Sequence, residues 1–295
     1  MHPSSETINL IKQVLPDELD AANSLLQFQP VRGGSINHCY RVVLDQENSW
    51  FLKLNSSELF PELLQQEVKG LAAIRRKKQI RVSSVIACSE EHEQQFLLLK
   101  WIKSGPRTRS FWTSLGEQLA QLHQNTNNEY GWPEDNYIGS LSQWNSFDAD
   151  WISFFISQRI NPQLEMALSK KLITPAIMAQ FERLFPRLLF IYDTEKPSLL
   201  HGDLWSGNLM CNEKSEPVLI DPAVYYGHRS MDLGMTTLFG GFDAAFYESY
   251  ASVYPLHPDH AEQWEISNLY PLLIHLNLFG IQYLPRIVEI LKRYI

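Results

Sequence analysis

The stretch HGDLWSGN at residues 201–208, followed by VLID at residues 218–221, indicates the kind of fold that this chain adopts. Three of its side chains carry oxygen atoms that can accept hydrogen bonds or bind a metal ion: Asp203, Asn208 and Asp221. Short apolar segments flank them. Phosphoryl transfer requires a carboxylate that orients the attacking hydroxyl and two oxygen ligands that hold Mg²⁺ on the nucleotide phosphates. Pairing of a strand that begins at Asn208 with a strand that ends before Asp221 would bring the three together. The spacing therefore predicts a kinase-like catalytic loop, although Asp and Asn also serve as ordinary turn residues.

A second set of residues, within the first hundred positions, fits the same chemistry. Lys53 interrupts an apolar strand, and a buried ammonium group needs a charge partner. Glu67, on a predicted helix, is the candidate, because a Lys–Glu pair aims the lysine at the α- and β-phosphates in kinases. The turn Gly33-Gly34-Ser35 could lie over the phosphates, but it matches neither GxGxxG nor a Walker A motif. Each of these features is also compatible with a purely structural role.

The composition narrows the class of protein. The chain has 295 residues, of which 44% are apolar and 20% charged, as is usual for a globular protein. Lys and Arg number 25 against 33 Asp and Glu, and the net charge of −8 argues against nucleic acid or an anionic membrane as partner. The three cysteines include no CxxC pair, so neither a disulfide framework nor a structural zinc site is expected. The sequence shows no signal peptide or membrane span, which makes the cytoplasm the expected location.

Hydrophobic periodicity predicts an α+β fold with two lobes. We expect residues 1–102 to form a nucleotide-binding lobe with a small antiparallel sheet and one main helix, and residues 103–295 to form a larger helical lobe for catalysis and substrate binding. A long ordered loop is expected at 125–145. Strands are expected at 28–32, 37–44, 50–54, 82–88 and 95–102. Helices are expected at 6–15, 61–78, 111–123, 151–160, 173–191, 231–239, 244–254 and 261–295, the last with breaks at Pro271 and Pro285.

The sequence resembles the fructosamine (ketosamine) 3-kinase family, which is related to aminoglycoside phosphotransferases and choline kinases and has a protein-kinase-like fold. HGDLWSGN is the most specific element, because Trp205 separates it from the general small-molecule kinase pattern. The resemblance extends over nearly the whole chain. Its other elements are GGSI at 33–36, FLK at 51–53, EVKGL at 67–71, LAQLH at 119–123, GW at 131–132, DPAVYYGHRSMDLGM at 221–235, LFGGF at 238–242, YPL at 254–256 and LIHLNLFG at 273–280.

The resemblance implies an ATP- and Mg²⁺-dependent kinase that phosphorylates the 3-hydroxyl of a ketosamine, either free or attached to a protein lysine, as a step of deglycation. Asp203 would be the catalytic base, and Asn208 and Asp221 the Mg²⁺ ligands. Trp205 and His275 would line the sugar-amine pocket. The nucleotide would be bound by Lys53 with its partner Glu67, by Gly33, Gly34 and Ser35, and by the linker residues Leu99, Lys100 and Ile102. His201 and Asp232 would support the catalytic loop.

Four positions depart from the family pattern. Lys100 lies at a linker position where the family often has an acidic residue. Ser35 lies where some members carry a cysteine, so thiol-based redox control through that position is not expected. Ser230 and Gly234 also differ from the usual choices, and the sequence offers no reason for them.

Two other functions remain open at this level. One is a kinase for another hydroxyl acceptor, such as an aminoglycoside or a choline-like amino alcohol. A polycationic aminoglycoside would favour an acidic cleft, whereas a ketosamine suits an aromatic wall such as Trp205. The other is a nucleotide-binding module without activity, which would have lost at least one of the groups needed for catalysis. Those groups are all present in this chain: Lys53, Asp203, Asn208 and Asp221.

Overall fold

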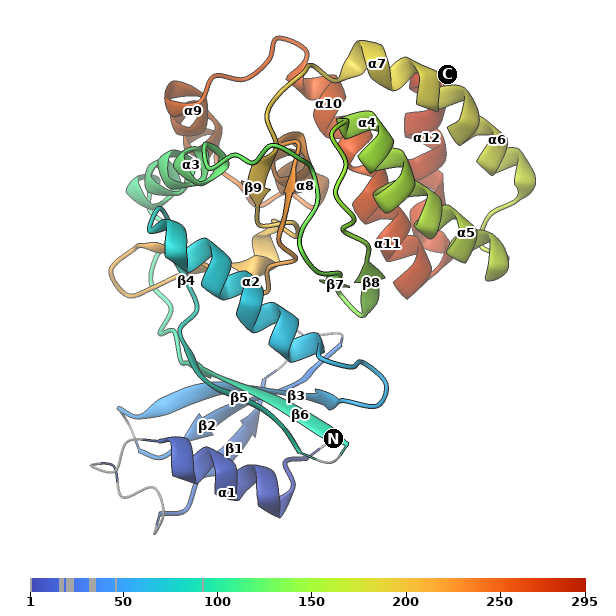
Figure 1. Cartoon of the computed structure of the whole chain (residues 1–295). Helices are drawn as coiled ribbons and strands as arrows, with labels where there is room; N and C mark the ends of the chain where they lie inside the picture. Colours follow the sequence, from blue (N-terminus) through green and yellow to red (C-terminus); the bar gives the residue numbers. More distant parts are fainter. Residues whose placement is uncertain (1, 16–18, 20–23, 32–35, 46, 92) are drawn as a thin grey trace.

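The computed structural model describes residues 2–15, 19, 24–31, 36–45, 47–91 and 93–295. A small lobe contains a five-stranded sheet, and a larger lobe above it in Figure 1 consists mainly of helices. The two-lobed α+β fold predicted from the sequence is therefore confirmed. No helix in the described ranges is both long enough and apolar enough to cross a membrane.

The sheet of the small lobe is antiparallel and runs in the order β1-β2-β3-β6-β5. Its strands are β1 (Gln27–Pro30), β2 (His38–Val43), β3 (Ser49–Ser56), β5 (Val85–Glu91) and β6 (Gln94–Lys100). Lys53 lies in β3 between Cys39 of β2 and Leu97 of β6. This central position buries the lysine side chain, which is 3% exposed.

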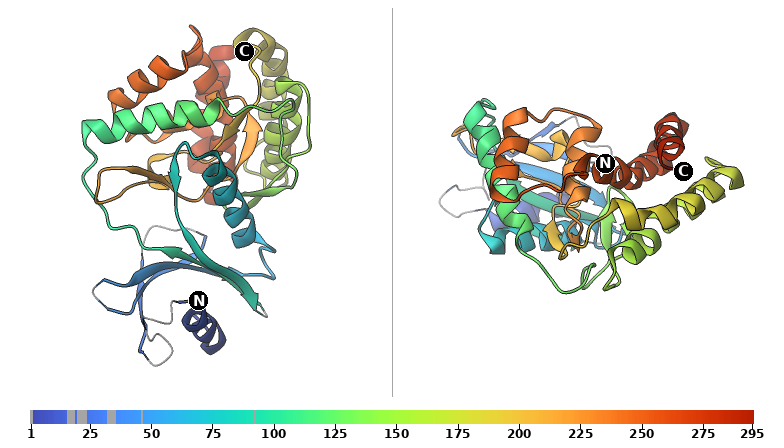
Figure 2. Two further views of the ribbon diagram at one scale, coloured as in Figure 1. Left: turned by 60° about the vertical axis from the view of Figure 1, so that its left-hand side comes forward. Right: turned by 90° about the horizontal axis from the view of Figure 1, so that it is seen from above.

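Two helices pack against the sheet, α1 (Ser5–Val14) and α2 (Leu63–Lys77). The hydroxyl of Ser4 accepts a hydrogen bond from the backbone N–H of Thr7 and so caps α1. Side chains alternate between the two faces along a strand. Accordingly, Phe96 and Leu98 of β6 join the cluster beneath α1, whereas Leu97 and Leu99 join the one that contains α2. The helix α2 thus lies on the side of the sheet that faces the large lobe (Figure 2).

In the described residues the backbone joins the lobes at two places. The chain leaves β6 through the segment 101–108 and enters α3 (Arg109–His123). In addition, the short strand β4 (Arg81–Val82), which follows α2, pairs in parallel with β11 (Pro217–Leu219) of the large lobe. The strand β11 pairs in turn with β10 (Leu209–Cys211), as the sequence predicted for this part of the chain. The catalytic motif is therefore attached to both lobes.

The large lobe buries most of its apolar side chains in one cluster among its helices. Its remaining strands are β7 (Asn136–Ile138), β8 (Leu141–Gln143), β9 (Ser198–Leu200) and β12 (Tyr225–Gly227). Its longer helices, besides α3, are α5 (Asn161–Ser169), α6 (Pro175–Leu184), α8 (Ser230–Leu238), α9 (Ala244–Val253), α10 (His260–Ser267), α11 (Leu269–Phe279) and α12 (Leu284–Tyr294). Its short helices are α4 (Trp151–Phe154), η2 (Phe155–Ile160), η3 (Phe185–Arg187), α7 (Leu188–Ile191), η4 (Ser206–Asn208) and η5 (Ile281–Tyr283).

Several predicted boundaries were wrong. The expected loop at 125–145 contains the β7–β8 hairpin, and α5 was not predicted at all. Pro271 and Pro285 do not break the last helical segment; each lies in the first turn of a helix, where proline is tolerated because its missing N–H has no partner there. The chain instead turns at Asn268 and at Gly280, whose φ of 105° is accessible to glycine.

Candidate active site

A cavity of about 630 Å³ lies between the two lobes. From the small lobe it is lined by Lys53, Glu67 and the linker residues Leu99, Lys100, Trp101 and Ile102. From the large lobe it is lined by residues of the catalytic motif and of α11, namely Asp203, Trp205, Asn208, Asp221 and His275. The volume lies in the range usual for small-molecule sites. The residues singled out in the two halves of the sequence therefore meet in one cleft.

The loop that carries Asp203 connects β9 to η4 and β10. Gly202 precedes Asp203 with a φ of 85°, and a Cβ atom at this position would lie 1.9 Å from the carbonyl oxygen of Ala223. Only glycine satisfies both conditions. The close approach of the two backbone segments fixes where Asp203 enters the cavity.

Asn208 holds Asp203 in place. Its Nδ2 donates hydrogen bonds to the Oδ2 of Asp203 at 2.7 Å and to the backbone oxygen of Asp203 at 2.8 Å. With Nδ2 so engaged, the Oδ1 of Asn208 has no donor in the described part of the chain and is available to a cation. Burial at the floor of the cleft raises the pKa of the Asp203 carboxyl to about 7, and the nearby Asp221 and Asp232 act in the same direction, opposed by the hydrogen bond from Asn208. Asp203 is thus a carboxylate of increased proton affinity.

Lys53 is paired with two carboxylates, one from each lobe. Its Nζ lies 2.8 Å from Glu67 on α2 and 2.5 Å from the Oδ1 of Asp221. Burial alone would lower the pKa of Lys53, but the charges of Asp221 and Glu67 raise it above its ordinary value, so the lysine stays charged. Burial raises the pKa of Glu67. Asp221, at φ 55°, is in the left-handed region, which aspartate tolerates better than most residues.

Asp232, at the start of α8, holds the catalytic loop from behind. Its Oδ2 accepts from the backbone N–H of His201 at 2.7 Å and its Oδ1 from that of Gly202 at 2.8 Å. A third hydrogen bond comes from the Nε2 of His123 at 3.1 Å. Burial would raise the pKa of Asp232, but the hydrogen bond and charge of His123 outweigh it and the pKa is lowered. Asp232 is therefore an ionised, buried anchor.

His201 connects the same loop to the segment before Asp221. Its Nε2 lies 2.9 Å from the carbonyl oxygen of Ile220, so Nε2 carries the proton, and Nδ1 accepts from the N–H of Asp203 at 3.3 Å. Burial lowers the pKa of His201, which keeps the imidazole neutral. The neutral ring therefore fixes the separation of the segments that carry Asp203 and Asp221, and it adds no charge to the site.

Replacing Asp232 by asparagine should destabilise the protein. The carboxylate now accepts three hydrogen bonds, and the NH₂ group of an asparagine would point at one or more of these donors instead. We expect a loss of about 2–4 kcal/mol in the free energy of unfolding, the range for breaking a buried charged hydrogen-bond group. Urea denaturation measures it. Asp259→Asn, an exposed change in the loop before α10, is the matched control and should alter stability by less than about 0.5 kcal/mol. Equal stabilities for the two variants would contradict the anchoring role.

The rings of Trp205, His275 and Phe279 line the cavity on the side of the large lobe, and Phe239 packs against Trp205 and His275 without lining it. The rings of Trp205 and Phe239 are 6.0 Å apart edge to face, and His275 lies 4.9 Å from Phe239 and 5.4 Å from Phe279. The Nδ1 of His275 donates to the carbonyl oxygen of Pro271 at 2.7 Å, which leaves the lone pair on Nε2. Burial lowers the pKa of His275, so the ring is a neutral acceptor. This wall can bind an apolar or hydroxyl-bearing group.

The expected residues Gly33, Gly34 and Ser35 lie outside the described residues. Two contributors were not predicted from the sequence. His123 was seen only as the end of the LAQLH segment, although its side chain contacts Asp232. Phe239 belongs to the segment LFGGF at 238–242, which is part of the family resemblance, but nothing in the sequence placed its ring against Trp205 and His275.

Comparisons with known proteins agree with this geometry. The family model for fructosamine kinase matches residues 7–295. A Vibrio parahaemolyticus protein named probable ketoamine kinase is 38% identical over 280 residues, which cover 94% of this chain and 95% of that protein. A chloroplastic protein-ribulosamine 3-kinase of Oryza sativa subsp. japonica is 34% identical over 281 residues, or 93% of this chain and 80% of that protein.

Solved structures also include a similar protein whose name refers to fructosamine-3-kinase. The crystal structure of a Haemophilus somnus protein provisionally named a fructosamine-3-kinase superposes with a TM-score of 0.85 at 27% identity and covers 97% of this chain and 96% of that chain. The match in sequence extends over nearly the whole chain, and the match in structure includes both lobes. The protein is therefore a kinase with a protein-kinase-like fold, and it belongs to the fructosamine kinase family.

Proposed function

We propose that this protein transfers the γ-phosphoryl group of ATP to the 3-hydroxyl of a ketosamine, such as a fructosamine or ribulosamine, free or attached to a protein lysine. The observation that carries the proposal is the meeting of Lys53, Asp203, Asn208 and Asp221 with an aromatic wall in one cavity. In this proposal residues 1–102 are the nucleotide-binding lobe and residues 103–295 provide catalysis and acceptor binding. The reaction belongs in the cytoplasm, with which the three free cysteines are consistent.

Asp203 is proposed to orient the acceptor hydroxyl and take its proton as the bond to phosphorus forms. A carboxylate with a pKa near 7 is suited to this, because a catalytic base works best when its pKa is close to the working pH. Phosphoryl transfer has a loose transition state, so positioning and neutralisation of charge contribute more than proton removal. Lys53, fixed by Glu67, supplies positive charge for the phosphates.

The donor set near Asp203 suits a hard divalent cation, for which we propose Mg²⁺. The Oδ1 of Asn208 is free of donors in the described residues, and only one oxygen of Asp221, Oδ1, is recorded as contacting Lys53. Amide and carboxylate oxygens are the ligands that Mg²⁺ prefers, and it takes them together with nucleotide phosphates. When bound, the ion would neutralise charge on the phosphates.

The nucleotide base is proposed to bind at the linker that forms one edge of the cavity. Leu99, Lys100 and Ile102 all line it there, and the backbone of an extended segment offers both donors and acceptors to a purine. Trp205 and His275 are proposed to contact the sugar and amine of the acceptor. The neutral Nε2 of His275 is an acceptor for a sugar hydroxyl.

The cavity favours a ketosamine over an aminoglycoside. Its described carboxylates are Glu67, Asp203 and Asp221, and each is already assigned to Lys53, to the acceptor hydroxyl or to the metal ion. None is left over to bind the several ammonium groups of an aminoglycoside. The aromatic wall instead fits a sugar with a single amine.

A coupled ADP-release assay with Mg·ATP tests the function. The acceptors are fructosamine and ribulosamine derivatives of blocked lysine, a glycated protein, choline and an aminoglycoside. We expect turnover with the ketosamines alone, and NMR of the product should show phosphate on O3. Turnover confined to choline or the aminoglycoside would replace the proposal with that acceptor class. Absence of turnover with every acceptor, in a preparation that binds ATP, would favour a nucleotide-binding module.

A further inference from the structure

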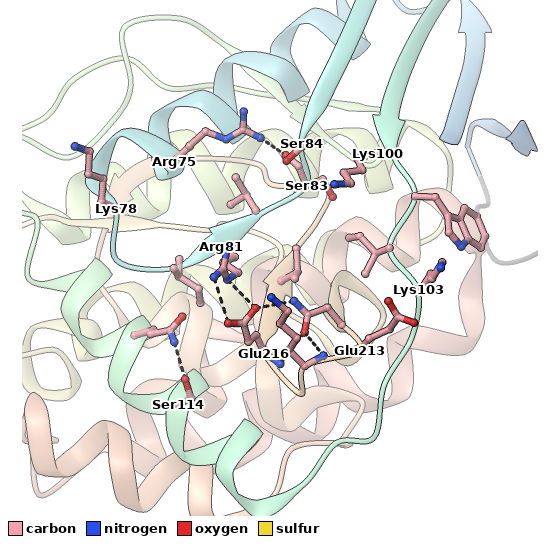
Figure 3. A pocket seen from close by; sticks show the side chains of 18 of the residues that line it. Arg75, Lys78, Arg81, Ser83, Ser84, Lys100, Lys103, Ser114, Glu213 and Glu216 are labelled. Atoms are coloured by element: carbon pink, nitrogen blue, oxygen red, sulfur yellow. Dashed lines mark hydrogen bonds and ion pairs between the residues drawn. The ribbon is translucent and has the colours of Figure 1, made fainter. Parts of the chain in front are cut away.

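A second cavity, of about 1000 Å³, lies against the linker between the lobes. It shares part of its lining with the nucleotide cleft, because Ser83, Lys100, Trp101 and Ile102 line both. The rest of its wall comes from the C-terminal end of α2, from β4, from α3 and from the turn between β10 and β11 (Figure 3). The linker therefore lies between this second cavity and the nucleotide cleft.

Positive charge predominates in this second cavity. Six cationic side chains line it against three carboxylates, a surplus of three positive charges on a chain whose net charge is −8. The cations are Arg75, Lys78, Arg81, Lys100, Lys103 and Lys214, and the carboxylates are Glu47, Glu213 and Glu216. Hydroxyl groups of Ser49, Ser83, Ser84 and Ser114 lie among them. Such a lining attracts anions and supplies them with hydrogen-bond donors.

Most of these cations have no acidic partner within the described ranges. Arg81 is paired with Glu216 at 3.1 Å, and Arg75 donates to the carbonyl oxygen of Ser83 at 2.5 Å. Lys78, Lys100 and Lys103 form no ion pair with a described residue, and Lys214 acts on Glu216 only as a weaker charge beside Asn212 and Arg81, which lower the pKa of that carboxyl more strongly. All six cations are exposed to solvent, so water and salt screen their mutual repulsion. An anion that enters the cavity would nevertheless be attracted by several of these charges at once.

The cations come from three walls of the cavity. Figure 3 shows Arg75 and Lys78 at the end of α2, Arg81 in β4, and Lys100 and Lys103 along the linker. The sixth cation, Lys214, belongs to the β10–β11 turn. A single phosphate would fill only a small part of a cavity of about 1000 Å³. A ligand with several phosphate groups could contact all three walls and would be held by both lobes.

We propose that this cavity binds a small molecule that carries two or more phosphate groups. The proposal does not depend on the reaction in the other cleft, because it concerns a different cavity. It also gives a physical role to Lys100, the linker residue that departs from the family pattern by its charge. The cavity is large enough for an occupant of the size of a sugar bisphosphate or a nucleotide.

The test measures the binding of inorganic tripolyphosphate by calorimetry, with the nucleotide cleft filled by a saturating non-hydrolysable ATP analogue and Mg²⁺. The variant Lys78→Asn/Lys103→Ser/Lys214→Ser removes three charges from the cavity and spares Lys100. Asparagine is chosen at 78 because Lys78 has a φ of 58°, which asparagine tolerates. The matched control is Lys171→Asn/Lys196→Ser/Lys292→Ser, which removes three exposed charges elsewhere, one of them also at φ 58°.

We expect one saturable site for tripolyphosphate in the wild-type protein, with an affinity that falls as salt rises. Removal of three cations should weaken it by about tenfold or more, whereas the control should stay within about twofold. Inorganic phosphate should bind more weakly than tripolyphosphate at the same site. No saturable binding in the wild type, or equal weakening in the two triple variants, would overturn the proposal. Ketosamine turnover is not part of the readout, so failure here and failure of the kinase function are distinguishable.

Discussion

Asp203→Asn should lower kcat by about 10³-fold, within the range that a positioned general base contributes, and should change the affinity for ATP by less than about threefold. The carbonyl oxygen of the new asparagine can still accept the hydrogen bond that Asn208 now donates to Asp203. The loop is therefore expected to keep its shape, and the loss falls on the chemical step. Steady-state kinetics and calorimetry with ATP measure the two quantities.

The same substitution should increase stability at alkaline pH. Burial raises the pKa of Asp203 from 3.8 to about 7 in the folded protein, so between these pH values the unfolded state ionises first and the free energy of unfolding falls as pH rises. Below about pH 4 the carboxyl is protonated in both the folded and unfolded states, and the effect vanishes. The advantage of the asparagine variant should thus grow between pH 4 and pH 7 and remain constant above it.

Turnover and stability, measured on the same variant, together distinguish a functional residue from a structural one. A residue that merely supports the fold would lose activity and stability together, as Asp232→Asn should. An Asp203→Asn protein that is less stable than the wild type at pH 8, or that retains wild-type turnover, would contradict the role proposed for Asp203.

The catalytic motif could be predicted from sequence because its spacing is local. Asp203 and Asn208 are five positions apart, and the strands that follow them pair as a hairpin, so short-range rules are sufficient. The pairing of Lys53 with Glu67 was predicted for a similar reason: an isolated charge in an apolar strand requires a partner. The contact between Lys53 and Asp221 could not be derived in this way, because it depends on how the two lobes close.

Other features had no local signal. His123 resembles any residue at the end of an amphipathic helix, and its role arises only when α8 brings Asp232 to it. The positive cavity behind the linker collects cations from positions 75 to 214, which no sequence window contains. The helix breaks were misplaced because proline was read as a terminator, whereas its position within the first turn decides its effect.

Lys53→Met should cause a large loss of both activity and stability. The change removes the positive charge proposed to hold the phosphates, and we expect kcat/KM for ATP to fall by at least about 10²-fold. It also leaves Glu67, which is 10% exposed, without its counter-charge. Removal of one partner of a buried ion pair typically costs about 3–5 kcal/mol. Urea denaturation and initial rates at varied ATP measure the two losses.

The double variant Lys53→Met/Glu67→Leu should separate the two effects. Replacing both members of a buried pair by apolar groups of similar size is often neutral, so most of the stability should return while the activity stays lost. The matched control is Lys69→Met, on the same helix as Glu67. It breaks an exposed ion pair with Glu134 and should lower the free energy of unfolding by less than about 1 kcal/mol. If the double variant were as unstable as Lys53→Met, the instability would not come from the uncompensated Glu67. If Lys53→Met kept wild-type kcat/KM, Lys53 would not act on the phosphates. Removal of a charge that binds them must reduce the stabilisation of the transition state and so lower kcat/KM.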